Sequence, residues 1–189
     1  RRRDMNRGVA SRPRLFEPQA GMRLIALGFA IACGGRSKPP EVVPSAANTT
    51  MINRDGRRIG TAAVLPSSSG GLLVLKLTGV PPGTHGLHLH TNGVCDPPNF
   101  DTAGPHYEPG TRKHGSKNPA GPHAGDMPNV VSRADSSVDT TLSIPASAVS
   151  AIGSGRAARS LVLHAGPDDL ATDPSGNSGA RFACGVLER

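Results

Sequence analysis

The chain has 189 residues, which suits one domain of ordinary size with appended segments. It contains no Trp, one Tyr and four Phe against 24 Gly and 18 Pro. Its core must therefore be aliphatic and its turns frequent, which favours short strands over long helices. The formal net charge is +7, but residues 1–32 hold seven Arg, and the remainder has 14 basic and 12 acidic residues. Without a basic stripe on the folded part, nucleic acid is excluded as a partner.

Residues 1–33 have the features of a leader. Residues 1–21 show no apolar periodicity, and the short apolar run LIALGFAIAC then ends at Cys33. Because a membrane-spanning helix needs ~20 apolar residues, this run indicates a secretory signal instead. The small residues before Cys33 resemble a bacterial lipoprotein processing site, and a plain signal peptide that contains a cysteine is the alternative. We expect an exported protein, periplasmic or elsewhere in the cell envelope, which contacts the membrane only through a lipid on Cys33.

Residues 34–47 are rich in Pro, Gly and Ser and lack periodicity, which indicates a flexible tether. A single domain is expected over residues 48–189. Its hydrophobic alternation, and a hairpin turn signal at Asp55-Gly56, indicate eight short strands. The pattern predicts an all-β fold, in which eight short antiparallel strands with two long loops fit a Greek-key barrel or sandwich. The expected strands are NTTMINR, RRIGTAAVL, LLVLKLT, HGLHLH, NVVSR, VDTTLSI, SLVLH and RFACGVL.

Six of the seven histidines lie between His85 and Asp126. Imidazole suits both copper and zinc, and carboxylate is an ordinary zinc ligand, so this stretch predicts metal binding. His88 and His90 alternate with leucines, so on a strand both rings leave one face while the leucines enter the core. His85 has the parity of the leucines and is expected to support the site without being a ligand. Further candidates follow in Gly- and Pro-rich sequence at His106, His114, His123 and Asp126, and later at His164.

The segments HGLHLH, AGPHYEP, KHG, HAGDMPN, LVLHAGPDDL and GNSGARFACGV occur in this order between about Asn48 and Leu187. In this combination the chain resembles the copper–zinc superoxide dismutase family, in particular its bacterial exported or lipoprotein type. The resemblance implies an immunoglobulin-like arrangement of the sandwich with two long functional loops, and dismutation of superoxide to oxygen and hydrogen peroxide. A redox-cycling copper would be bridged through His106 to a structural zinc. The implied ligands are His88, His90, His106 and His164 for copper, and His106, His114, His123 and Asp126 for zinc.

The resemblance also implies roles for residues around the metals. His106 and Arg181 would be catalytic, with His106 taking up a proton when copper is reduced and Arg181 guiding the anion. Asp168 would bond the ring nitrogens of His88 and His114 that face away from the metals. Cys95 and Cys184 would form a disulfide, as an even pair of cysteines in an exported protein favours.

Three points stay open at the level of sequence. The first is a domain of the same fold that buffers or delivers copper and zinc without turnover; the filled ligand positions and Arg181 favour the enzyme. The second concerns which residues besides Arg181 attract the superoxide anion. Members of the family often place guiding charges between the positions of His164 and Arg181, but this stretch contains no Lys here. We therefore expect Arg112, Lys113 and Lys117 to attract the anion. They lie in the zinc loop, which carries the implied zinc ligands His114 and His123. A homodimer is also open, because subunit contacts differ between branches of the family.

Overall fold

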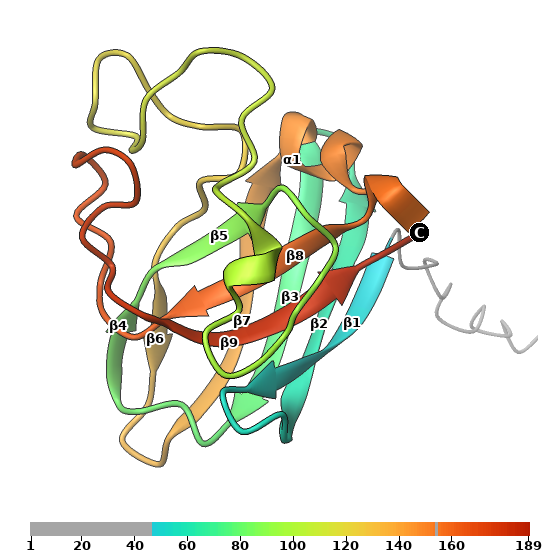
Figure 1. Ribbon diagram of the computed structural model, residues 1–189, viewed down its shortest axis with the longest axis vertical. Coiled ribbons are helices and arrows are strands. Elements are labelled where there is room, and N and C mark those ends of the chain that lie inside the picture. Colours follow the sequence, from blue (N-terminus) through green and yellow to red (C-terminus); the bar gives the residue numbers. More distant parts are fainter. Residues whose placement is uncertain (1–46, 154) are drawn as a thin grey trace, which may run out of the picture. The chain divides into compact units, whose positions relative to one another are not determined.

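The computed structural model describes residues 47–153 and 155–189 (Figure 1). The expected leader over 1–33, with Cys33, lies outside the described residues, as does the tether up to residue 46. Among the described residues, no helix is long and apolar enough to cross a membrane. The strands are β1 Ala47–Asn53, β2 Arg58–Ser67, β3 Gly70–Thr78, β4 Gly83–His85, β5 Leu87–His90, β6 Val130–Ser132, β7 Ser137–Pro145, β8 Arg159–His164 and β9 Arg181–Leu187. The helices are α1 Ala146–Ala151 and the 3-10 helices η1 Asp101–Ala103 and η2 Gly155–Ala157.

The strands form two antiparallel sheets, a larger one in the order β5-β8-β9-β1-β2-β3-β7 and a small one of β4 and β6. Strands distant in sequence become neighbours, with β9 beside β1 and β7 beside β3, as in Greek-key connections. Figure 1 shows that the larger sheet is strongly curled and that long loops extend beyond one end of β5 and β8. The prediction of an all-β antiparallel fold is confirmed.

The expected count of eight strands is wrong by one within the described residues, because HGLHLH forms two strands that meet at Gly86. β4 pairs with β6, whereas β5 pairs with β8. At the break, the Gly86 amide donates to the Gly166 carbonyl, and the Gly86 carbonyl accepts from the His164 amide. A Cβ at Gly86 would lie 2.8 Å from the Cβ of Ser178. The chain therefore changes sheets where a side chain would collide with the loop after β8.

The core is aliphatic, as the composition predicts. In β3, Leu73, Leu75 and Leu77 are buried while Lys76 is exposed. Strand β5 differs because all four of its residues are buried. Leu87 and Leu89 belong to the aliphatic cluster, where burial of a leucine contributes about 1.5–3 kcal/mol. The opposite face of β5 carries histidines that the long loops cover.

The disulfide between Cys95 and Cys184 joins the first long loop to β9. The bonded cysteines are 89 residues apart, so closing this loop contributes about 4–5 kcal/mol in the chain-entropy model. Phe100 is fully buried in a small cluster beside Cys184 and Val162. The segment that follows Cys95 is thus packed against the middle of β8 and β9, next to the histidine face of β5.

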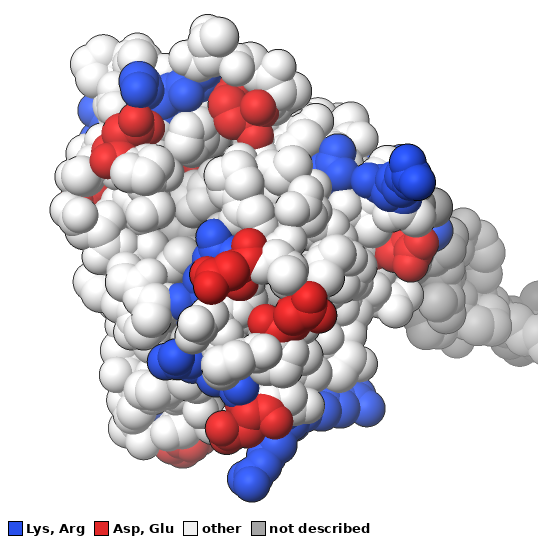
Figure 2. Space-filling view, in the orientation of Figure 1, with Lys and Arg blue, Asp and Glu red and all other residues white. Residues whose placement is uncertain are grey.

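On the face shown in Figure 2, basic and acidic side chains are interspersed. Some opposite charges among the described residues form local pairs. Lys76 and Asp139, for example, lie 3.5 Å apart, and Lys113 and Asp173 lie 2.9 Å apart. Both pairs are largely exposed to solvent, so each contributes little to stability.

Candidate metal centre

The first donor set gathers around the end of β5. His88 and His90 come from this strand, His164 is the last residue of β8, and His106 is bridged to His90 by an isolated β-bridge. Backbone hydrogen bonds from the Tyr107 amide to the Leu89 carbonyl, and from the Leu89 amide to the Gly125 carbonyl, hold the loop against β5. The sheet register and this loop pairing therefore bring the four rings together.

Four nitrogens in this set have no protein partner. Each ring offers a donor atom within 4.8 Å of the others, and all four side chains are buried. Buried polar atoms are almost always hydrogen-bonded, so converging nitrogens without partners mark a place for a metal ion. Four imidazole nitrogens also make the donor set that copper favours. The atoms are His88 Nδ1, His90 Nε2, His106 Nε2 and His164 Nε2.

The other nitrogen of each of these rings faces an oxygen. His88 Nε2 lies 2.7 Å from Asp168 Oδ2, and His90 Nδ1 lies 2.7 Å from the Gly104 carbonyl. His164 Nδ1 lies 3.0 Å from the Gly179 carbonyl. A ring N–H that donates to these oxygens leaves the lone pair on the inward nitrogen, as metal-binding histidines require.

The second donor set centres on one carboxylate oxygen. Oδ1 of Asp126 lies 3.0 Å from Nδ1 of His106, 3.0 Å from Nδ1 of His114 and 3.3 Å from Nδ1 of His123. Oδ2 of Asp126 accepts from the backbone amides of Gly115 and His123. Three imidazole nitrogens and one carboxylate oxygen are a tetrahedral zinc set.

A grouping by mutual distance alone would put His88 with His106, His114 and Asp126. We assign His123 to the zinc set instead, because its Nδ1 shares the Asp126 oxygen. His88 has one ring nitrogen bonded to Asp168, and its other nitrogen belongs to the first set. His106 contributes a nitrogen to each set, Nε2 to the first and Nδ1 to the second.

Asp168 connects the two donor sets through ring nitrogens that face away from the first set and from Asp126. Its Oδ1 lies 3.0 Å from Nε2 of His114, while its Oδ2 bonds His88, as the resemblance implied. Two residues that the sequence did not single out hold it. Asn129 exchanges hydrogen bonds with both the amide and the carbonyl of Asp168. Gly176 has a φ of 63°, and a Cβ there would lie 1.8 Å from Asp168 Oδ1.

The two sets differ in their protonation. Burial lowers the pKa of His90 to about 2, that of His106 to about 4 and that of His164 to about 3. These rings are therefore neutral at pH 7, with lone pairs free for a metal. Burial also acts to lower the pKa of His114, but its bonds to Asp126 and Asp168 outweigh this and raise the pKa to about 9. Without zinc, a proton on His114 balances the two carboxylates.

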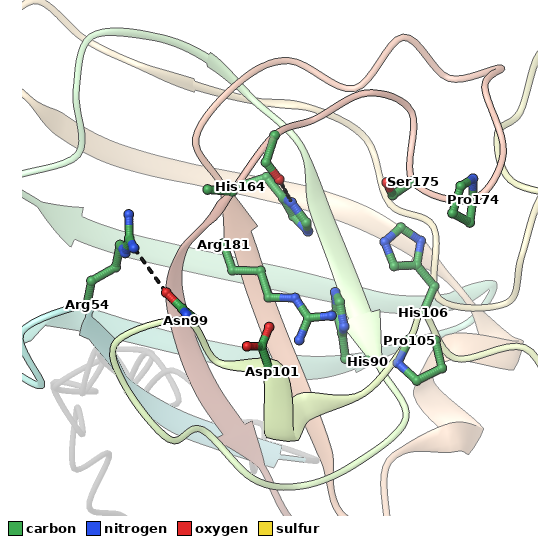
Figure 3. A pocket seen from close by; sticks show the side chains of 12 residues that line it. Arg54, His90, Asn99, Asp101, Pro105, His106, His164, Pro174, Ser175 and Arg181 are labelled. Carbon is green, nitrogen blue, oxygen red and sulfur yellow. Dashed lines mark hydrogen bonds between the residues drawn. The ribbon is translucent and has the colours of Figure 1, made fainter.

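A cavity of about 460 Å³ opens onto the first set (Figure 3). Arg181 lines it beside His90, His106 and His164. Its Nη1 donates to the Phe100 carbonyl and its Nη2 to the Gly104 carbonyl, the oxygen that also orients His90. The nearby guanidinium acts to lower the pKa of both His90 and His164. An anion that enters the cavity therefore meets a fixed positive charge beside the inward nitrogens.

The basic residues of the zinc loop contact other groups and do not line this cavity. Arg112 donates to the Gly121 carbonyl, Lys113 pairs with Asp173, and Lys117 lies 3.5 Å from the Asp169 carbonyl. Arg54 lines the cavity instead. The only signal for it in the sequence is a basic residue at the start of the first hairpin turn.

His85 lies outside both donor sets, as its parity predicted. It is buried, and its ring nitrogens face the carbonyl oxygens of His164 and Pro81 at 2.8 and 2.7 Å. The ring therefore fixes the backbone of His164, a residue of the first set.

Comparisons with known proteins agree with this geometry. The family model described as copper/zinc superoxide dismutase (SODC) matches residues 59–187. "Superoxide dismutase [Cu-Zn] 2" of Aquifex aeolicus is 40% identical over 148 residues, 75% of this chain and 85% of that protein. "Superoxide dismutase-like protein YojM" of Bacillus subtilis is 35% identical over 185 residues, 88% of this chain and 93% of that protein.

Solved structures agree as well. A superoxide dismutase-like protein from Bacillus subtilis superposes with a TM-score of 0.69 at 32% identity, over 74% of this chain and 97% of that one. Cu/Zn superoxide dismutase from Brucella abortus superposes with a TM-score of 0.61 at 30% identity, over 74% of this chain and 97% of that one. Copper and zinc are the cofactors of this family, and the two donor sets suit them. Sequence, fold and donor chemistry coincide, and the chain belongs to the copper/zinc superoxide dismutase family.

Proposed function

We propose that the protein is an enzyme that dismutates superoxide to oxygen and hydrogen peroxide. The observation that carries this proposal is the complete set of four buried nitrogens without partners, open to a cavity that also contains Arg181. Copper held by His88, His90, His106 and His164 would supply one-electron redox chemistry, and zinc held by His106, His114, His123 and Asp126 would fix the loop.

Arg181 binds and orients the anion in this proposal. A guanidinium has five N–H donors, and two nitrogens of Arg181 are used by the carbonyls of Phe100 and Gly104. These bonds fix the side chain and leave other N–H groups for an anion in the cavity. Its pKa is lowered by burial, with Asp101 acting in the opposite direction, but a guanidinium stays charged at any physiological pH.

His106 supplies a proton. Dismutation consumes two superoxide ions and two protons and yields one oxygen and one hydrogen peroxide. Nε2 of His106 faces the cavity side of the site without a protein partner. If Nδ1 of His106 binds zinc, a proton on Nε2 would leave the ring neutral, and from there it could be transferred to a reduced oxygen species in the cavity. The second proton comes from water that enters the cavity.

A non-catalytic copper- and zinc-binding domain is the second candidate. One observation favours it: a relative that aligns with 88% of this chain is named superoxide dismutase-like. Against it stand the complete donor set and Arg181 at the cavity wall.

Metal stoichiometry combined with a dismutation assay separates the two candidates. We expect one copper and one zinc per chain and a rate of superoxide loss far above that of the metal-free chain. A chain that holds both metals and leaves superoxide loss unchanged would support the buffering or delivery domain.

We further propose that the protein acts outside the cytoplasm, attached to a membrane through a lipid on Cys33. The signal-like run before Cys33 and the Cys95–Cys184 disulfide support export, because disulfides persist in oxidising compartments. The variant Cys33→Ser should move the protein from the membrane fraction to the soluble fraction. A variant that stays with the membranes would refute the lipid anchor.

A further inference from the structure

A second arginine lies at the cavity that opens onto the first donor set, which is called the copper set from here on because we propose that it binds copper. Arg54 follows β1 directly, in the turn that leads to β2, and it lines the same cavity as Arg181. Its Nε donates to the Pro98 carbonyl at 3.1 Å, and its Nη2 donates to Asn99 Oδ1 at 3.1 Å (Figure 3). These bonds tie the hairpin to the disulfide-bonded loop. The long side chain is therefore held at the cavity wall instead of moving freely in solvent.

The two arginines occupy different depths. Arg54 and its partner Asn99 are exposed, whereas Arg181 is half-buried and its charge acts on the buried rings of His90 and His164. The Arg54 guanidinium uses two of its nitrogens for loop oxygens, so N–H groups remain for other ligands. An anion that enters from solvent would meet Arg54 first and Arg181 second.

The charge of the cavity depends strongly on Arg54. Among the lining residues, two guanidiniums face the single carboxylate of Asp101. The segment 165–180 contains no Lys or Arg. The basic residues of the zinc loop lie elsewhere, and Lys113 is paired with Asp173. Without Arg54, the lining side chains would carry one positive and one negative charge, and the long-range attraction of anions by the protein would weaken.

We propose that Arg54 is the outer anion-guiding residue of this chain, which attracts a small monovalent anion to the cavity mouth before Arg181 binds it. This rests on the proposed function where the anion is superoxide. It holds for any small inorganic anion that enters the same cavity.

The test compares Arg54→Gln with Arg57→Gln in the full chain loaded with copper and zinc. Arg57 is exposed on the same hairpin and lies outside the cavity lining, so both variants lose the same net charge. At low ionic strength, Arg54→Gln should slow superoxide loss about two- to fivefold and flatten its salt dependence. Arg57→Gln should change the rate far less, and Arg54→Lys should restore most of it. Equal losses in the two Gln variants would overturn the proposal.

Azide binding to the copper(II) form gives a readout that does not require turnover. In stopped-flow absorbance, Arg54→Gln should lower the association rate constant for azide about two- to fivefold and leave the dissociation rate constant nearly unchanged. Metal content and thermal midpoint should match those of Arg57→Gln. Unchanged azide association would refute the role of Arg54 even if dismutation falls. Slower azide association without any dismutation in the unmodified chain would refute only the proposed function.

Discussion

The two donor sets are built from different kinds of structure. The copper set takes His88, His90 and His164 from paired strands, where Leu87 and Leu163 fix the register by packing into the core. The zinc set takes His114 and His123 from one loop rich in Gly and Pro. Hydrogen bonds to Asp126 and a bond from the His114 amide to Asp173 hold that loop. The sheet register positions the nitrogens of the copper set. In the zinc set, the raised pKa of His114 indicates that its ring carries a proton beside Asp126 and Asp168 when no metal is bound.

The largest expected effect separates the two sets by removing one ring from each. His164→Ala removes a copper donor, so we expect dismutation to fall to the background rate while zinc remains bound, because His164 takes no part in the zinc set. His123→Ala is the matched variant and should lose zinc while copper is retained. Metal analysis of both proteins checks this. Loss of zinc from His164→Ala would show that the sets are not separable.

The pH dependence of metal affinity should also differ between the sets. Zinc must displace the proton of His114, whose pKa is raised to about 9, so zinc affinity should rise about tenfold per pH unit from pH 7 to 9. In the zinc-free chain, the copper rings His90, His106 and His164 have lowered pKa values and are already neutral in that range, so each can bind copper through the ring nitrogen that carries no proton. Copper affinity should therefore change little. Competition titrations at several pH values measure both affinities. Zinc and copper affinities that rise equally with pH would contradict the expected difference between the two sets.

Asp168 is the residue through which the sets are connected. Asp168→Asn keeps the shape but removes the charge that orients His88 and His114. We expect the affinities for both metals to fall by about 10- to 100-fold, with zinc more affected because two oxygens of Asp168 contact His114. If the affinity for only one metal falls, Asp168 supports the donor set of that metal alone.

The smallest expected effect lies at the cavity mouth. Asp101 is exposed and is the acidic residue of the cavity lining. Asp101→Asn should raise the rate of anion capture about twofold or less at low ionic strength and leave it unchanged at high salt. Asp139→Asn is a matched control, because Asp139 is also exposed and lies outside this cavity. A rate increase that persists at high salt would indicate a change in structure instead of charge.

Local pattern was sufficient for much of the fold and for part of the site. Alternation placed His88 and His90 on the face opposite Leu87 and Leu89, and it separated His85 from the ligands. Spacing alone did not divide the remaining histidines between two metals, and family resemblance supplied that division. Geometry explains why, since His123 enters the zinc set only through the Asp126 oxygen that it shares with two other rings.

The features that sequence reasoning missed depend on contacts between distant segments. Gly86 lies at the break between β4 and β5, where Ser178 approaches it from the loop after β8. Asn129 supports Asp168 from 39 positions earlier in the chain, and Gly176 leaves the space that the Asp168 carboxylate fills. Arg54 reaches the cavity only because the loop after Cys95 folds back to meet it. None of these contacts produces a periodic or local signal in the sequence.

The central claim is that the ring of His106 lies between two different metal ions. A crystal structure of the metal-loaded protein, with anomalous data collected on both sides of the copper and zinc absorption edges, tests it directly. We expect a copper signal beside Nε2 of His106 and a separate zinc signal beside Nδ1. A single metal signal, or a His106 ring that contacts only one of the two ions, would contradict it.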